Sequence, residues 1–286
     1  MIDVIRLGYA DSTHGRWIAE WVKEQLLHDN AAIDIQLIPV TSSLIGFAEL
    51  NVIPDALTTV DIVVVDGSFL PTKDAPGVVV AAVCERADPR QSIIGDGAAI
   101  TVWHPSLAAV LRVTDPSVLV DIDSSLIDAF DDGNKQRQSG THSTIMPMHA
   151  ASRMSGQRLG QTPVEAEDML PICGQGAVLV YTKASDVDLG TYIFGVLNVV
   201  ETRREITVER FFKAQLHDQF HDTVCSYATG SDRFLYLFVT LVIGKTIFKT
   251  RSGSHITALS SIVDQAITDL ESQSGKVIRS SEAPAT

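Results

Sequence analysis

The residues whose types and spacing could do chemistry include a group near position 220. His217 and His221 stand four residues apart, with Asp218 and Asp222 beside them. On a helix this spacing would place two imidazoles on one face, where they could ligate a transition metal. The stretch lacks the glutamate of an H-E-x-x-H motif, and an amphipathic helix is predicted to end here. We therefore interpret it as a solvated helix terminus and predict no metal site.

Other candidate groups point to no specific reaction. His104, His142 and His149 could act as acids or bases, but no serine or cysteine nucleophile occupies a recognisable elbow. We interpret them as ordinary loop or surface histidines. Gly174-Gln175-Gly176 lacks the Lys and Ser/Thr of a phosphate-binding loop and is predicted to form a tight turn between domains.

Composition limits the partners and the compartment. The 286 residues carry 35 Asp and Glu against 22 Lys and Arg, a formal charge of −13, which argues against a nucleic-acid partner. Three widely spaced cysteines favour a reducing compartment over a disulfide scaffold. Neither a signal peptide nor an apolar run long enough to span a bilayer is recognisable. We expect a cytoplasmic monomer without a membrane partner.

Alternating strands and helices must position any site. Apolar runs predict strands, and residues at helical spacing predict helices around Trp17–Leu27, Glu205–Leu216 and Ile256–Leu270. The predicted strands are Asp3–Leu7, Ile33–Val40, Val60–Val65, Val78–Val83, Ile100–Trp103, Val118–Ile122, Ala177–Tyr181 and two runs within Arg233–Phe248. This alternation predicts α/β domains with parallel or mixed sheets, followed by a small α+β domain.

Several motifs resemble one family in the same order along the chain. Glu167 to Ala177 is similar to the E-M-L-P-x-x-G-Q-G-A stretch of hydroxymethylbilane synthases, also called porphobilinogen deaminases. Ala81 to Arg90 resembles their A-A-V-x-x-R-x-D-P-R motif, and Val208-Glu209-Arg210 resembles their A-E-R helix. Arg6-Leu7-Gly8, Ser12, Trp17 and Ala19-Glu20 follow the N-terminal register, and Tyr227-Ala228 falls where the family has A-Y-A.

The resemblance implies three domains: two α/β domains of periplasmic-binding-protein type and a small α+β domain. We place them at 1–90 with 187–203, at 91–186 and at 204–279, followed by a disordered tail at 280–286. The family condenses four porphobilinogen molecules into hydroxymethylbilane, releasing ammonia, on a dipyrromethane cofactor attached to a cysteine. The resemblance thus implies a transferase of porphyrin and heme biosynthesis, with porphobilinogen as its small-molecule partner.

Most of the family's catalytic positions are substituted in this chain. The catalytic Asp position is Phe69, and the preceding Lys is Ser68. Ala108 and Ala109 stand at the positions where the family has paired arginines in its cleft. No Lys or Arg occurs between Lys23 and Lys73 or from Val113 to Asn134. Charge-assisted bonds to substrate carboxylates are therefore lost, at roughly 1.5–3 kcal/mol each.

The cofactor position is also substituted. Alignment from Val208 without gaps puts Phe220 at the position of the family's cofactor-binding cysteine. Cys225 could take over that role only if the alignment were shifted by an insertion. Ser12 and Arg153 match family carboxylate ligands, although Ser12 could simply cap a helix and Arg153 could be a surface cation.

Two interpretations of the divergence remain open. In the first, the chain keeps feeble deaminase activity through Cys225, Ser12 and Arg153. Asp66 lies near the lost catalytic Asp but would point elsewhere, which makes it an unlikely substitute. In the second, it is a pseudoenzyme that binds a small organic anion or serves as a scaffold subunit. The missing cofactor anchor, carboxylate and arginines favour the second interpretation.

Overall fold

The computed structural model describes residues 2–43, 45–48, 51–69, 75–123, 126, 142–154 and 161–280. These residues fall into two units. The first unit contains the described residues of Met1–Ala87 and Gly176–Arg203. The second contains those of Asp88–Ile127, Asp131–Gln175 and Arg204–Thr286.

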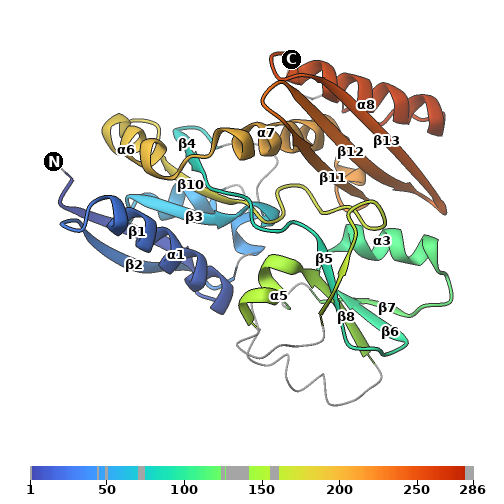
Figure 1. Cartoon of the computed structure of the whole chain (residues 1–286), viewed down its shortest axis with the longest axis horizontal. Coiled ribbons are helices and arrows are strands. Elements are labelled where there is room, and N and C mark those ends of the chain that lie inside the picture. The colour runs from blue at the N-terminus through green and yellow to red at the C-terminus, as the bar shows by residue number, and fades with distance from the viewer. Residues whose placement is uncertain are drawn as a thin grey trace. The chain divides into compact units, whose positions relative to one another are not determined.

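A five-stranded mixed sheet forms the centre of the first unit (Figure 1). Its order is β2-β1-β3-β10-β4, where β1 is parallel to β2 and β3, and β10 is antiparallel to β3 and β4. The strands are β1 (Val4–Ala10), β2 (Asp34–Thr41), β3 (Ile62–Asp66), β4 (Val78–Val83) and β10 (Val178–Lys183). Every residue of β3 is buried, which explains its unbroken apolar run.

Helices cover this sheet and bury its apolar side chains. α1 (Thr13–Asp29) contacts β1 and β3, and α6 (Val187–Leu197) contacts β4, β10 and α1. Their buried residues recur at helical spacing and join the strands in one core. Short helical segments complete the unit: η1 (Ile45–Ala48), α2 (Val52–Ala56) and η2 (Gly67–Phe69).

The second unit contains another mixed sheet, of order β7-β6-β8-β5-β9. β6 is parallel to β7 and β8, whereas β5 is antiparallel to β8 and β9. Its elements are β5 (Gln91–Ile94), β6 (Ala99–Val102), α3 (Pro105–Thr114), β7 (Val120–Ile122), β8 (His142–Pro147), α5 (Met148–Met154) and β9 (Gln161–Val164).

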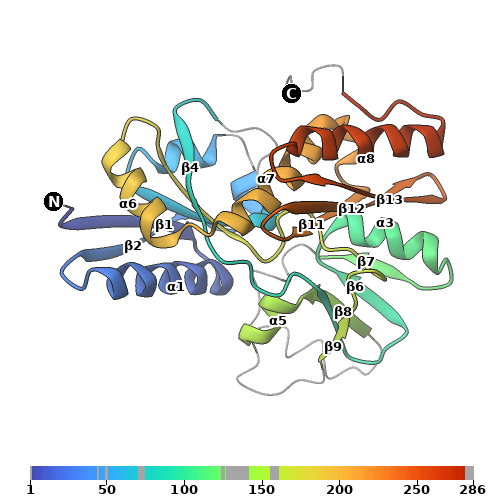
Figure 2. The same ribbon diagram turned by 45° about the horizontal axis from the view of Figure 1, so that its top comes forward.

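A three-stranded antiparallel sheet, β11-β12-β13, belongs to the same unit. Its inward residues form a core with α7 and α8, while α3 contacts β11 and β13. Figure 2 shows α8 on one side of this sheet and α3 on the other. The elements are α7 (Val200–Gln215), η5 (Asp218–Phe220), β11 (Val224–Gly230), β12 (Phe234–Ile243), β13 (Thr246–His255) and α8 (Leu259–Ser274).

The structure confirms the predicted fold class, with two mixed α/β sheets and a small antiparallel sheet with helices. One strand differs from expectation: β10 lies within 91–186, the range assigned to the second domain, but pairs with β3 and β4 of the first unit. An apolar run predicts a strand but not its partner, which explains the difference. The three-domain division stays a prediction, and most of the expected tail, 281–286, lies outside the described residues.

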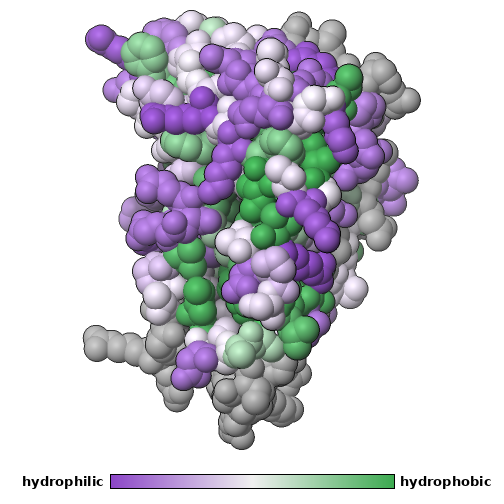
Figure 3. Space-filling model, turned by 90° about the vertical axis from the view of Figure 1, so that its right-hand side faces the viewer, coloured by the Kyte–Doolittle hydropathy of each residue, from purple (hydrophilic) through white to green (hydrophobic). Residues whose placement is uncertain are grey.

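Apolar side chains also reach the surface. Leu119 is 75% exposed, and Ile122 in β7, an edge strand of the second sheet, is 42% exposed. Figure 3 shows one face of the molecule, on which hydrophobic residues gather between hydrophilic ones. Among the described residues, no helix has the length and apolarity needed to cross a membrane.

Candidate functional site

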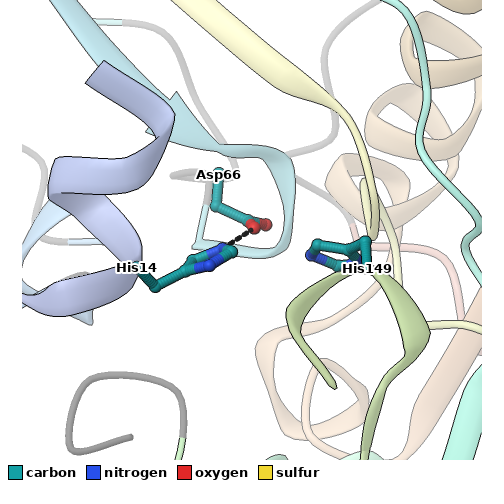
Figure 4. A group of neighbouring side chains, drawn as sticks. All are labelled: His14, Asp66 and His149. Atoms are coloured by element: carbon teal, nitrogen blue, oxygen red, sulfur yellow. Dashed lines mark hydrogen bonds and ion pairs between the residues drawn. The ribbon is translucent and has the colours of Figure 1, made fainter. Parts of the chain in front are cut away.

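A buried histidine–aspartate pair lies in the first unit. The His14 Nε2 atom is 2.9 Å from the Asp66 Oδ2 atom, and Figure 4 shows the imidazole directed at the carboxylate. The side chains are only 5% and 2% exposed. The other carboxylate oxygen, Asp66 Oδ1, accepts the backbone N–H of Ser68 at 2.9 Å. Both oxygens of the Asp66 carboxylate are therefore engaged, one with His14 and the other with the backbone of Ser68.

The topology of the first sheet brings the two residues together. β1 and β3 are parallel neighbours, so their carboxyl ends lie at the same sheet edge. Asp66 is the last residue of β3, and His14 lies in the first turn of α1, which follows β1. Gly15 lets the first turn of α1 lie close to the end of β1, because a Cβ there would lie 2.3 Å from the Ala10 carbonyl oxygen.

The pair could perform acid–base chemistry. In the tautomer with its proton on Nε2, His14 donates to Asp66, and the carboxylate orients the imidazole. Ligands of open α/β sheets commonly bind at the carboxyl ends of strands, where this pair lies.

Sequence reasoning did not single out His14, and it treated Asp66 only as a weak substitute for the lost carboxylate. The available signal was a histidine just after one strand and an aspartate ending another. That signal is useful only once β1 and β3 are known to be neighbours. His149, also labelled in Figure 4, belongs to α5 in the second unit and is buried rather than the expected surface histidine.

Two positions that the resemblance matches to reactive residues of the family hold buried phenylalanines. Phe69, in η2, and Phe220, in η5, are each 7% exposed. Phe220 belongs to the apolar core that α7 and α8 form with the third sheet. An apolar ring can neither accept a pyrrole N–H nor form a thioether. These two side chains therefore contribute packing rather than a reactive group.

Cys225 is a poor alternative anchor. It lies on β11 and is 1% exposed, and burial raises the pKa of its thiol to about 12. Only the thiolate is an effective nucleophile. With Phe220 at the aligned position and Cys225 inside the sheet, these residues do not fit a covalently attached dipyrromethane.

Ser12 has a clear structural role. Its hydroxyl accepts the Gly15 backbone N–H at 3.0 Å, which makes it the N-cap of α1. It lies two residues before His14, and its role as a carboxylate ligand stays a prediction. Arg153 lies in α5, but its side chain is outside the described part of the structure.

Replacement of the Ser12 cap should destabilise α1. We expect Ser12→Ala to lower the free energy of unfolding by about 1 kcal/mol, because the Gly15 N–H loses its acceptor. Ser12→Asn should keep most of that stability, since an asparagine oxygen can cap the same helix. Thermal or urea unfolding of both variants measures the effect, and equal stability of Ser12→Ala and wild type would contradict the capping role.

Two arginines that belong to the family-like motifs bind carboxylates of this chain. Arg6 Nη2 lies 2.7 Å from Asp61 Oδ1, and Arg90 Nη2 lies 2.9 Å from Asp88 Oδ2. Hydrogen bonds from Arg90 lower the pKa of Asp88. Both guanidinium groups are therefore engaged within the protein.

The histidines near position 220 do not share a helix face. α7 ends at Gln215, and His217 and His221 flank η5. The His221 Nε2 atom lies 3.1 Å from the Lys213 carbonyl oxygen, and burial lowers its pKa. The predicted end of the helix is thus confirmed, whereas His217 and His221 are partly buried rather than fully solvated.

His104 is a helix cap with an unusual protonation equilibrium. Its Nδ1 accepts the Ser106 N–H at 3.1 Å at the start of α3. Burial, together with the nearby Lys213 cation, lowers the pKa of His104 to about 3. The neutral imidazole is therefore the form that the folded protein accommodates.

This shifted pKa predicts acid sensitivity. An unfolded histidine protonates near pH 6.5, whereas folded His104 does so near pH 3, so stability from this group is present above pH 6.5 and is lost as pH falls toward 3. His104→Asn can keep a cap without titrating. Between pH 7 and 5 we expect the variant to lose about 1–2 kcal/mol less than wild type. Urea unfolding at each pH checks this, and parallel losses would contradict it.

The glycine-flanked turn is confirmed as structural. Gly174 and Gly176 have φ values of 81° and 87°, and Gln175 between them is fully buried. Gln175 Oε1 accepts the Gln91 side-chain amide at 2.8 Å, and its own amide donates to the Pro89 carbonyl. The chain passes from one unit to the other between Gln175 and Gly176.

The fold and these side chains define a mixed α/β protein with a buried histidine–aspartate pair. No family model matches the chain. Porphobilinogen deaminases of Acidothermus cellulolyticus and Desulfitobacterium hafniense are 26% and 24% identical over 239 and 276 residues. These alignments cover 73% and 88% of this chain, and 70% and 89% of those proteins.

A porphobilinogen deaminase of Mycobacterium avium is 30% identical over 184 residues, which are 60% of this chain and 55% of that protein. The similarities suggest the porphobilinogen deaminase family, at low identity.

Among solved structures, the regulatory domain of the transcriptional activator MexT of Pseudomonas aeruginosa has a TM-score of 0.40 at 12% identity, over 69% of this chain and 99% of that chain. An arginine-specific periplasmic binding protein of Salmonella typhimurium has a TM-score of 0.40 at 10% identity, over 68% and 91%.

Proposed function

We propose that this chain is a divergent member of the porphobilinogen deaminase family, linked to tetrapyrrole biosynthesis, that has lost the family's condensation reaction. In this proposal it binds small organic anions without processing them. The proposal combines a family-level similarity with a set of side chains that lacks the family's reactive groups.

The observation that carries the proposal is the burial of Cys225, together with the phenylalanine at the position aligned with the family's anchor cysteine. Its thiol is enclosed on β11, with a pKa of about 12, and Phe220 occupies part of the neighbouring core. A covalent primer needs a thiolate that can reach the cofactor precursor. The substitution at Phe69 adds to this, because no carboxylate stands at that position to stabilise a cationic pyrrole.

The intact mass of the purified protein tests the proposal. We expect the bare sequence mass and no colour with an acidic aldehyde reagent, because no dipyrromethane is attached. Incubation with porphobilinogen should release no ammonia above the level of heat-denatured protein. A mass increase equal to a dipyrromethane, together with turnover, would contradict the proposal.

The His14–Asp66 pair favours a second candidate function, a residual deaminase. Asp66 ends β3 three residues before Phe69, and its carboxylate is buried and already oriented. In this candidate, Asp66 supplies the negative charge lost at Phe69, and His14 exchanges protons.

Paired variants separate the second candidate from the first. If the second is correct, weak ammonia release by wild type should fall at least tenfold in Asp66→Asn, which nearly preserves shape but removes charge. Asp61→Asn is the matched control, since that carboxylate lies one residue before the same strand and pairs with Arg6. Equal rates in wild type and Asp66→Asn would exclude the second candidate.

A further inference from the structure

The face of the third sheet opposite α8, part of which α3 covers, carries a row of aromatic side chains. Along β12, Leu235, Leu237 and Val239 are buried in the core with α7 and α8. The alternate residues therefore point to the opposite face. Of these, Phe234 is 50% exposed, Tyr236 is 36% exposed, and Phe238 is half-buried.

Polar and cationic residues on β13 lie beside this row. Directly paired residues of an antiparallel sheet share a face, and Phe238 pairs with Arg251, Tyr236 with Gly253 and Phe234 with His255. Lys249, two residues before Arg251, pairs with Thr240. We call this set the aromatic–cation face: Phe234, Tyr236, Phe238, Lys249, Arg251 and His255.

The rings of this face are held in place. The Arg251 Cζ atom lies 4.6 Å from the Tyr236 ring centroid and 5.1 Å from that of Phe238, both within cation–π range. Gly253 lets Tyr236 lie against the neighbouring strand, because a Cβ there would be 2.5 Å from Tyr236 Cδ1. Phe234 and His255 form an edge-to-face pair with centroids 5.9 Å apart.

The positive charge on this face is not neutralised by a carboxylate in the described structure. Arg6, Arg90 and Arg279 each form an ion pair with an aspartate. Among the described residues, neither Arg251 nor Lys249 forms such a pair. In a chain of net charge −13, this exposed positive group beside three aromatic rings is complementary to an anionic aromatic ligand.

We propose that the aromatic–cation face binds a planar aromatic polyacid, with its ring stacked on the Arg251 guanidinium that lies over Tyr236 and Phe238, and with its carboxylates paired with the edge of Arg251 and with Lys249. Arginine suits this role because its guanidinium group can stack on a ring and bind a carboxylate with two hydrogen bonds. The choice of a pyrrole-based acid within this class rests on the proposed function. Cys225 lies on the same side of the sheet, because it pairs with Thr240 and Thr240 pairs with Lys249, but it is 1% exposed and is not part of the face.

A single-stranded nucleic acid also stacks on aromatic residues beside cations. Such binding needs a basic groove that follows the phosphate backbone, and the net charge of −13 opposes it. A compact ligand with clustered carboxylates needs only the local cations. The observations therefore favour the small polyacid.

The test uses the full chain and an octacarboxylic porphyrin as the probe, with binding followed by the Soret band and by calorimetry. We expect saturable binding that weakens at least tenfold in Arg251→Gln and in Tyr236→Ala. Phe194→Ala is the matched control, because Phe194 is 48% exposed and lies under Arg203 in the first unit. Its affinity should equal that of wild type.

Three outcomes would overturn this inference: absence of binding, equal binding by all variants, or equally tight binding of a tetracationic porphyrin. If single-stranded oligothymidine bound more tightly than the porphyrin, and if this binding depended on Arg251, the face would be a nucleic-acid site and the inference would be rejected. Failure of the proposed function gives a different result, a dipyrromethane adduct in the intact mass, which is measured separately from the porphyrin titration. The two proposals can therefore fail separately.

Discussion

Glu209→Ala should destabilise the second unit by about 3–5 kcal/mol, because two buried N–H groups lose a charged acceptor. Glu209 lies in α7, is fully buried, and accepts the Gly174 and Ala228 N–H groups at 2.7 Å each. One carboxylate thus joins the turn before β10 to the third sheet. Glu209→Gln should lose less, since its amide oxygen can still accept one of the two N–H groups.

The measurement is urea unfolding followed by the fluorescence of Trp103, which is buried in the second unit. Trp17→Phe and Trp21→Phe in the background remove the tryptophans of the first unit. Glu201→Ala, at an exposed position of the same helix, is the control and should change stability by about 0.5 kcal/mol or less. A loss below about 1 kcal/mol in Glu209→Ala would show that the two N–H groups find other acceptors.

Cys225 should resist thiol reagents in the folded protein by about a thousandfold relative to the unfolded chain. Its pKa is raised from 9.0 to about 12 by burial, so the thiolate fraction at pH 8 falls by about three orders of magnitude. Restricted access to a side chain that is 1% exposed slows the reaction further. Cys84, also buried and with a pKa of about 12, should behave in the same way.

Alkylation followed by peptide mass spectrometry distinguishes the three cysteines. Cys173, which is half-buried, is the internal control and should be modified first. Because the folded pKa is raised, stability from the protonated Cys225 thiol is present below pH 9 and is lost as the pH rises toward 12. Rapid alkylation of Cys225 in the folded protein would remove the main support for the proposal that the protein is inactive. A covalent primer on Cys225 would then be possible again.

Much of the fold could be predicted from local patterns. The apolar runs anticipated β1, β2, β3, β4, β6, β7, β10, β12 and the start of β13, and the helical spacing anticipated α1, α7 and α8. Their partners could not be predicted in this way. β10 was expected in the second domain, yet it pairs with β3 and β4 across a long separation in sequence. Strand pairing depends on contacts between distant segments, which periodicity does not encode.

The sequence by itself determined the chemical losses, because a phenylalanine at position 69 or 220 lacks a carboxylate or thiol in any conformation. Only the tertiary structure decided which remaining groups meet. The parallel pairing of β1 and β3 brings His14 to Asp66, and the register of β12 and β13 sets Arg251 beside Tyr236. Burial of Cys225 is likewise a tertiary property, because a thiol's pKa depends on the solvent that its neighbours exclude.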